Sequence, residues 1–250
     1  IKSDAIKKAV LARKTTYVFE SSVSPFMLLH HIQQDDNRVY NFCIKRNPTF
    51  SFIGGTPERL FEITDNRIES DAIAGTRFKT PKIPISTIKK ELKLSQKDQT
   101  EHQWVVDFIQ TCFSSLCASF NQGAHSIIEV KYLLHLFVPF CGILKRNNDW
   151  LTCLKKLHPT PAVAGSPKLA ASAHIMRHES IDRGWYAGPI GFISTKHTML
   201  LVAIRSGTVI NNTVNLYSGA GIVKDSDPIS EWNELNAKIN LFTQLFGGRK

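Results

Sequence analysis

The sequence has few of the features that mark disulfide-rich, zinc-binding or membrane-spanning proteins. Its 250 residues include only five cysteines, and no two of them form a Cys-x-x-Cys pair. This odd and scattered set argues against a disulfide framework and a zinc site, and it fits a reducing cytoplasm best. The longest apolar runs, such as "YLLHLFVPFCGIL", are interrupted by His and Pro, and they are shorter than the roughly 20 residues that span a bilayer. We therefore expect a cytoplasmic protein with no membrane partner.

Repeats, long linkers and nucleotide-binding loops are absent as well. The chain has no internal repeat, no low-complexity stretch and no polar linker long enough to separate two domains. The Gly-x-x-x-x-Gly-Lys-Ser/Thr pattern of a phosphate loop is missing, and "YSGAGIV" lacks the third glycine of a dinucleotide fingerprint. We therefore expect a single domain over residues 1–250.

Acidic residues are the scarcer charged group. The 21 Asp and Glu residues stand against 31 Lys and Arg residues, which gives a formal net charge of +10. The positive charge is spread along the chain and forms no run interleaved with aromatic residues, so a nucleic-acid partner is not favoured. An anionic small substrate and a basic surface without a role explain the excess equally well.

Hydrophobic periodicity predicts an α+β fold, with blocks of strands and helices in place of strict alternation. A first helix is expected over residues 5–13, where Ile6, Val10 and Leu11 follow the helical repeat. Strands are expected over 15–20, 38–46, 50–55, 58–64 and 66–75, followed by a helix from about Ser95 to Phe120. The rest of the pattern comprises paired strands over 126–144, helices over 149–157 and 166–180, an antiparallel meander over 188–194, 198–210 and 213–219, and a helix from Pro228 to about Leu245.

Two acid-rich helical motifs, "KDQTEHQWVVDF" and "DPISEWNELNAKIN", are candidates for a metal site. Asp98 and Glu101 are three residues apart on one helix face. Glu231, Glu234 and Lys238 fall within roughly a third of a helix circumference. Each motif also has a plain structural explanation. Acids suit a helix N-terminus, and a Glu–Lys pair four residues apart is the commonest surface pair.

Four further motifs place polar or small residues where a ligand could bind. Glu58 follows "GGTP" at a turn, where a solvated glutamate is the ordinary case, although the glycine pair indicates a close backbone approach. Small residues around Gly75 would let a strand end pack against a ligand. His158 in "LHPTPAVAG" belongs to no metal pattern and on its own would be structural. Gly219 and Gly221 follow a strand, and a turn there could receive a carboxylate on its backbone N–H groups.

In order and spacing, ten short blocks resemble the chorismate-utilising enzymes, the family of isochorismate, salicylate, anthranilate and aminodeoxychorismate synthases. They run from Lys8 to Lys238: "KAVLAR", "FIGGTPERLF", "DAIAGTR", "KDQTEH", "HL", "LHPTPAVAG", "WYAGPIGF", "AIRSG", "YSGAGIV" and "DPISEWNELNAK". Within this family "HPTPAVAG", "WYAG" and Lys8 resemble the isochorismate synthase branch. The resemblance implies a fold of antiparallel β-sheets packed with helices around a central active site. It also implies that the family's N-terminal segment is absent here.

The same resemblance implies a reaction and assigns residues to it. Chorismate would become isochorismate by addition of water at C2 and loss of the C4 hydroxyl, with Lys8 as the general base and Glu58 as the general acid. Glu101 and Glu234 would be the direct ligands of Mg²⁺, and Asp98 and Glu231 would hold metal-bound waters. The implied substrate contacts are Gly75, Thr76, His158, Ala187, Arg205, Gly219, Gly221 and Lys238.

These implied roles agree with elementary chemistry. Mg²⁺ takes oxygen ligands and keeps several waters, so two carboxylates and a substrate carboxylate suffice. A lysine base needs a lowered pKa, and a glutamate acid needs a raised one. The alternatives are a salicylate synthase of the same fold and a truncated, non-catalytic homologue. The product would feed menaquinone or siderophore biosynthesis, and a monomer is favoured.

Overall fold

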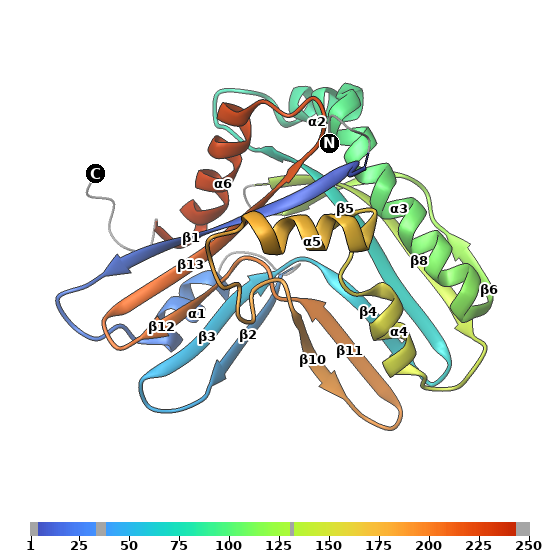
Figure 1. The fold of residues 1–250 in the computed structure, drawn as a ribbon, viewed down its shortest axis with the longest axis horizontal. Coiled ribbons are helices and arrows are strands. Elements are labelled where there is room, and N and C mark those ends of the chain that lie inside the picture. Colours follow the sequence, from blue (N-terminus) through green and yellow to red (C-terminus); the bar gives the residue numbers. More distant parts are fainter. Residues whose placement is uncertain (1–4, 34–38, 131–132, 244–250) are drawn as a thin grey trace.

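The computed structural model describes residues 5–33, 39–130 and 133–243, and within them two antiparallel β-sheets pack with helices (Figure 1). The first sheet has six strands in the order β2-β3-β12-β13-β1-β9, and the second has the path β10-β11-β4-β5-β8-β6, with β7 also paired to β8. This arrangement confirms the α+β class expected from the sequence. The strands of the first sheet are β1 (Lys8–Val18), β2 (Tyr40–Lys45), β3 (Phe50–Thr56), β9 (Gly165–Ser166), β12 (Ser206–Ile210) and β13 (Thr213–Ile222). Those of the second are β4 (Arg59–Thr64), β5 (Arg67–Phe78), β6 (Cys117–Gln122), β7 (Ser126–Val130), β8 (Leu133–Leu144), β10 (Pro189–Ile193) and β11 (His197–Val202).

Helices cover the outer faces of the two sheets. The long helix α3 (Gln96–Leu116) packs on β5, β6 and β8, and α6 (Pro228–Thr243) packs on β13. The helix α5 (Lys168–His178) crosses β1 at the front of the view in Figure 1. The remaining described helices are α1 (Pro25–Gln33), α2 (Ile85–Leu94) and α4 (Trp150–Leu157).

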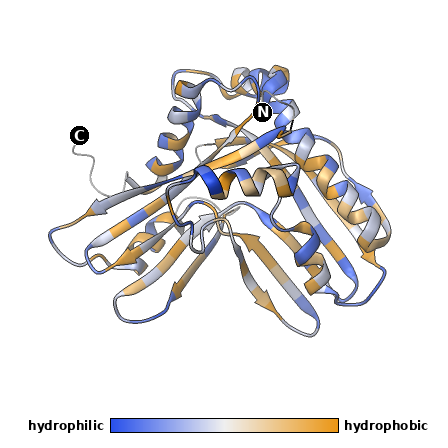
Figure 2. Cartoon of the chain, in the orientation of Figure 1, coloured by the Kyte–Doolittle hydropathy of each residue, from blue (hydrophilic) through white to orange (hydrophobic). Residues whose placement is uncertain are grey.

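The α3 helix illustrates how the sequence builds the core. The Ser95 side chain accepts a hydrogen bond from the Asp98 backbone N–H and so caps the first turn. One apolar stripe of the helix is buried against the second sheet, where Phe113 contacts Phe140 with ring centroids 5.6 Å apart. A second cluster around Ile53, Leu216 and Phe242 joins the first sheet to α6. Hydrophobic colours accordingly alternate with hydrophilic ones along many strands in Figure 2.

The structure corrects several predicted elements. Residues 8–18 form a strand where a helix was expected over 5–13, because a ladder from Ala9↔Ile222 to Val18↔Thr213 satisfies the backbone and overrides the helical periodicity. The expected strand over 198–210 is two strands in different sheets, β11 and β12. The break lies at Arg205, whose φ is 48°. The long helix ends at Leu116, and α1 and α2 were not predicted.

Candidate active site

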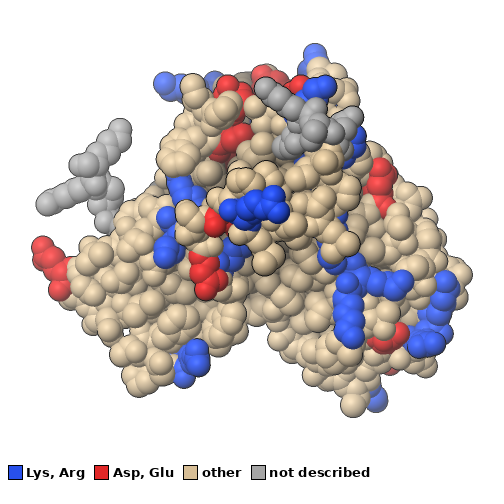
Figure 3. Space-filling view, in the orientation of Figure 1, with Lys and Arg blue, Asp and Glu red and all other residues tan. Residues whose placement is uncertain are grey.

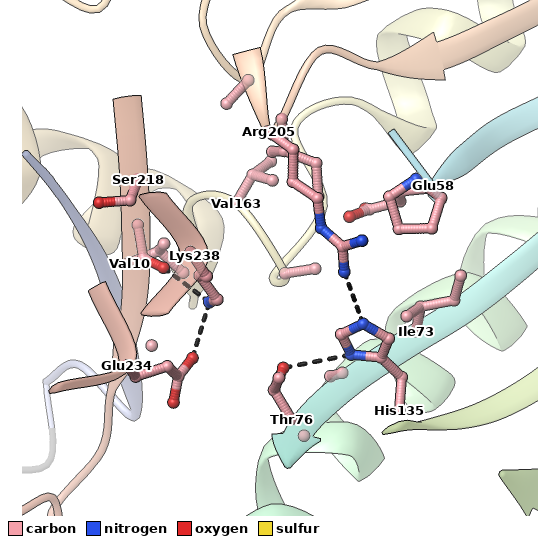
Figure 4. A pocket seen from close by; sticks show the side chains of 18 of the residues that line it. Val10, Glu58, Ile73, Thr76, His135, Val163, Arg205, Ser218, Glu234 and Lys238 are labelled. Atoms are coloured by element: carbon pink, nitrogen blue, oxygen red, sulfur yellow. Dashed lines mark hydrogen bonds and ion pairs between the residues drawn. The ribbon is translucent and has the colours of Figure 1, made fainter. Parts of the chain in front are cut away.

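A cavity between the two sheets collects most of the residues to which the resemblance assigned a role (Figure 4). Its wall is built from the end of β5, the N-terminal part of α3, β8, β13 and α6, and from the loops that follow β3 and β11. The assigned residues on this wall are Glu58, Gly75, Thr76, Glu101, Ala187, Arg205, Gly219, Gly221, Glu234 and Lys238. Segments that are up to 228 residues apart in the chain (from Val10 to Lys238) therefore meet at one place.

Unusual backbone conformations concentrate at this cavity. Gly75 has φ +65° and lies at a bulge where the β5–β8 register shifts, and a side chain there would press on Asp98 and Leu136. Ala187 and Arg205 have φ values of 61° and 48°, a region that non-glycine residues seldom adopt. Strained backbone of this kind is typical of binding and catalytic sites.

Lys8 lies directly behind the cavity and forms an ion pair with Glu101. The distance from Lys8 Nζ to Glu101 Oε1 is 2.9 Å, and the lysine side chain has no exposed area. Burial would raise the pKa of Glu101, but the charges of Lys8, Lys238 and Lys97 together outweigh it, so the pKa is lowered and the carboxylate is ionised. A Cβ atom at Gly221 would overlap both Glu101 Oε1 and Lys8 Cε, so this arrangement requires glycine at that position.

Glu58 has the properties of a proton donor. It is 6% exposed, and burial raises the pKa of its carboxyl to about 7 against the opposing charges of Lys8 and Arg205. The Thr160 hydroxyl donates to Glu58 Oε1 at 3.4 Å, and the Glu58 backbone N–H donates to Thr56 Oγ1 at 3.1 Å. A carboxyl that is about half protonated at neutral pH is suited to general acid catalysis.

Each of the acids assigned to the metal site is paired with a basic side chain. Glu234 forms an ion pair with Lys238 at 2.6 Å, and Lys238 also donates to the Gly219 carbonyl at 2.8 Å. Lys238 lines the cavity and is paired with Glu234 in this structure, so its role toward a substrate carboxylate stays a prediction. The other two acids, Asp98 and Glu231 (the outer acids), do not line the cavity; they form the ion pairs Asp98–Arg77 and Glu231–Lys97.

The donor set fits a magnesium ion. Glu101 and Glu234 present carboxylate oxygens to one cavity, and the buried Glu231 Oε2 has no hydrogen-bond partner among the described residues. Within the same residues no three His, Cys, Asp or Glu side chains converge as a metal cluster. Two carboxylates with room for waters and a ligand oxygen correspond to the way in which Mg²⁺ is commonly bound.

A hydrogen-bonded chain through His135 was missed by the sequence analysis. An Arg205 guanidinium N–H donates to His135 Nε2 at 2.7 Å, and His135 Nδ1 lies 3.2 Å from Thr76 Oγ1 (Figure 4). Because a guanidinium only donates, Nε2 is the acceptor and the ring proton is on Nδ1. Burial and the Arg205 charge hold the pKa of His135 well below its usual value, so the ring is neutral. The cross-strand register Thr76↔His135 creates this contact, and the sequence alone does not show it.

His158, Gly219 and Gly221 lie in other structural positions than the sequence predicted. His158 does not line the cavity; it follows α4, its carbonyl accepts from Lys168, and burial lowers its pKa to about 4. The "HPTPAV" segment reaches the cavity through Ala162 and Val163 instead. Gly219 and Gly221 lie inside β13 and not in a turn after it, since their backbone pairs with β1.

Comparison with known proteins places this site in a family. The family model described as "Chorismate binding enzyme" matches residues 1–247. Isochorismate synthase 2 (chloroplastic) of Arabidopsis thaliana is 37% identical over 246 residues, which cover 97% of this chain and 44% of that protein. Isochorismate synthase MenF of Bacillus subtilis is 34% identical over 253 residues, or 100% of this chain and 54% of the relative.

A solved structure agrees with the sequence matches. MenF, the menaquinone-specific isochorismate synthase from Escherichia coli, superimposes with a TM-score of 0.92 at 31% identity, covering 98% of this chain and 57% of that one. The chain thus spans about half the length of the curated relatives it matches. With a family match over nearly every residue and the fold in agreement, the chain belongs to the chorismate-binding enzyme family.

Proposed function

We propose that the protein is a Mg²⁺-dependent isochorismate synthase, which converts chorismate to isochorismate. The observation that carries this proposal is the buried Glu58, with a pKa of about 7, in the same cavity as Glu101, Glu234 and Lys238. The relatives named isochorismate synthases at 34–37% identity support the same reaction. The description of the MenF structure as a menaquinone-specific isochorismate synthase supports menaquinone biosynthesis as the destination of the product.

The reaction needs one proton removed and one supplied. Water loses a proton to Lys8 as its oxygen bonds to C2, the ring double bonds shift, and the C4–oxygen bond breaks. The departing hydroxyl takes the proton of Glu58 and leaves as water, so atoms and charge balance. Lysine as base and glutamate as acid require a cavity that excludes bulk water, because burial holds Glu58 protonated near neutral pH.

Lys8 can act as a base only as a neutral amine, so it must first leave Glu101 and give up its ammonium proton to solvent. An ammonium ion cannot accept a proton, and in this structure Lys8 is paired with an ionised carboxylate. The pair therefore represents a resting arrangement. A positively charged group is also present close to Glu58, since Lys8 is the strongest of the charges that oppose its raised pKa.

Arg205 and Lys238 supply positive charge for the substrate carboxylates. His135 holds the Arg205 guanidinium in place, and its own position is fixed by Thr76. Gly75, Ala187, Gly219 and Gly221 have small or no side chains on the cavity wall and leave room for the ring. Electrostatic positioning by preorganised groups is worth the most in such a dry site.

Glu101 and Glu234 would hold Mg²⁺, with Asp98 and Glu231 behind them. When bound, the ion would offset the repulsion between these carboxylates and a dianionic substrate and orient its ring. Among the described residues no helix is both long and apolar enough to cross a membrane. Figure 3 shows Lys and Arg dispersed over several parts of one face and not gathered into one band. A cytoplasmic location, a monomeric state and the absence of a nucleic-acid partner stay predictions.

Incubation with chorismate and MgCl₂ tests the proposal, with the products separated by liquid chromatography. Isochorismate is the expected product, and omission of the metal should abolish its formation. Salicylate and pyruvate as the main products would favour the salicylate synthase alternative. An absence of any turnover by the folded protein would favour a non-catalytic homologue.

A further inference from the structure

Every carboxylate of the proposed metal site already has a cation supplied by the chain. The four acids are ion-paired with four basic side chains, so their charges are balanced before any metal is present. The inner pairs, which involve acids of the cavity wall, are closed at 2.9 and 2.6 Å. The pairs are Lys8–Glu101, Lys238–Glu234, Arg77–Asp98 and Lys97–Glu231.

The inner pairs use the atoms that a divalent cation would need. Glu101 and Glu234 face the cavity, and one carboxylate oxygen of each is in direct contact with a lysine ammonium. An ammonium donates its protons to the same carboxylate lone pairs that a hard cation binds. The side-chain exposures are 0% and 16% for the Lys8 pair, and the Lys238 pair is partly buried at 23% and 22%. The attraction is therefore screened less than at an open surface.

Of the two inner lysines, Lys238 has a second partner that it can keep. Lys238 Nζ donates to the Gly219 carbonyl at 2.8 Å as well as pairing with Glu234. Lys8 Nζ is buried, and its contact among the described residues is the ion pair with Glu101. Lys238 can therefore leave Glu234 and keep a hydrogen bond, whereas Lys8 would have to gain a new partner to avoid the cost of an isolated buried charge.

We propose that Lys8 and Lys238 are internal counterions that close the metal site, so that a divalent cation binds to Glu101 and Glu234 only in competition with the two lysine ammonium groups. This inference rests on the proposed function, which assigns the two glutamates as metal ligands. It makes the resting protein stable without metal. It also ties the release of Lys8, the proposed base, to loading of the site.

Binding of Mn²⁺ provides a readout that is independent of turnover. Mn²⁺ accepts the same oxygen ligands as Mg²⁺, and free Mn²⁺ can be counted by electron paramagnetic resonance while the protein is titrated without chorismate. Lys238→Met removes the competing charge and should lower the dissociation constant of Mn²⁺ about tenfold, or about 1.4 kcal/mol. Lys238→Gln, which retains a donor for the Gly219 carbonyl, serves if the methionine variant does not fold.

Two matched variants separate direct competition for the carboxylates from the long-range electrostatic effect of removing any positive charge. Lys97→Met removes the lysine charge that is paired with the outer acid Glu231. It should change the dissociation constant of Mn²⁺ by no more than about twofold, since Lys97 need not move when the metal binds. Lys89→Met removes a lysine charge from a surface ion pair with Glu129 and should leave the dissociation constant of Mn²⁺ unchanged. Equal effects of Lys238→Met and Lys97→Met would overturn direct competition.

The outcomes also distinguish this proposal from the proposed function. If the wild type and all variants bind Mn²⁺ with the same affinity, the metal site stands and the counterion proposal is overturned. If none of them binds Mn²⁺, and chorismate is converted at the same rate without divalent metal, the metal assignment itself is wrong and the counterion proposal falls with it. Tighter binding by the Lys238 variants alone, with added Mg²⁺ displacing the Mn²⁺, supports both.

Discussion

Glu58→Gln should stabilise the protein at alkaline pH while it removes the general acid. Burial raises the pKa of Glu58 from the ordinary 4.5 to about 7. The folded protein therefore binds a proton more tightly than the unfolded chain, and stability is lost as pH rises from 4.5 through about 7. The difference of about 2.5 pKa units corresponds to about 3 kcal/mol at 1.36 kcal/mol per unit. Glutamine keeps the shape of the neutral acid and never ionises, so this loss disappears.

The magnitude is large enough for thermal unfolding. A stabilisation of about 3 kcal/mol at pH 8.5 should raise the Tm by roughly 6–12 °C for a chain of this size, and the difference from wild type should vanish near pH 4.5. Glu91→Gln changes an exposed glutamate on α2 and is the matched control, for which we expect no such pH-dependent gain. A Glu58→Gln variant that is no more stable than wild type at pH 8.5 would refute the raised pKa and the burial argument behind it.

The same substitution separates stability from catalysis. Loss of a general acid typically lowers the rate by about 10²- to 10⁴-fold. For the wild type, kcat/KM should fall as pH rises through about 7, because Glu58 must be protonated to donate. The Glu58→Gln variant should lack this alkaline limb. A wild-type rate that stays level from pH 6 to 9 would contradict the role of Glu58.

Three further substitutions test the surroundings of the site. Thr160→Val removes the hydrogen bond that lowers the pKa of Glu58, so the alkaline limb of the pH–rate profile should move to higher pH. His135→Phe removes the acceptor that holds Arg205, so KM for chorismate should rise by about tenfold, the scale of one lost charged hydrogen bond; an unchanged KM would exclude the positioning role. Gly221→Ala places a methyl group where two side chains already lie, so Mn²⁺ binding should weaken markedly; binding like that of the wild type would show that the neighbours can move aside.

The strand and helix content could largely be predicted from the sequence, but the assembly of the site could not. The helix from Pro228 and the paired strands over 126–144 follow clear local patterns, and the structure has both. The prediction of a helix over residues 5–13 failed because the apolar residues of this segment suit a helical repeat as well as a strand. Only the distant partner β13 decides between the two.

The acidic residues of the site show the same division between local and distant information. Helical spacing correctly places Asp98 and Glu101 together on α3, and Glu231 and Glu234 on α6. Their basic partners come from elsewhere in the fold, except for Lys238, and no spacing rule identifies them. His135 lies in one of the motifs that resemble the family, but its contact with Thr76 follows from the β5–β8 register, which the sequence does not show. His158 was assigned by resemblance, and the path of the chain after α4 keeps it out of the cavity.

The proposed reaction is tested most directly by conversion of chorismate in H₂¹⁸O with Mg²⁺, followed by mass spectrometry of the product. Water is the nucleophile at C2, and the C4 oxygen is lost, so the isochorismate formed should carry one ¹⁸O atom, at C2. Lys8→Met should abolish its formation while the protein remains folded. Isochorismate without the label, or labelled product formed equally well by Lys8→Met, would contradict the proposed reaction and the role of its base.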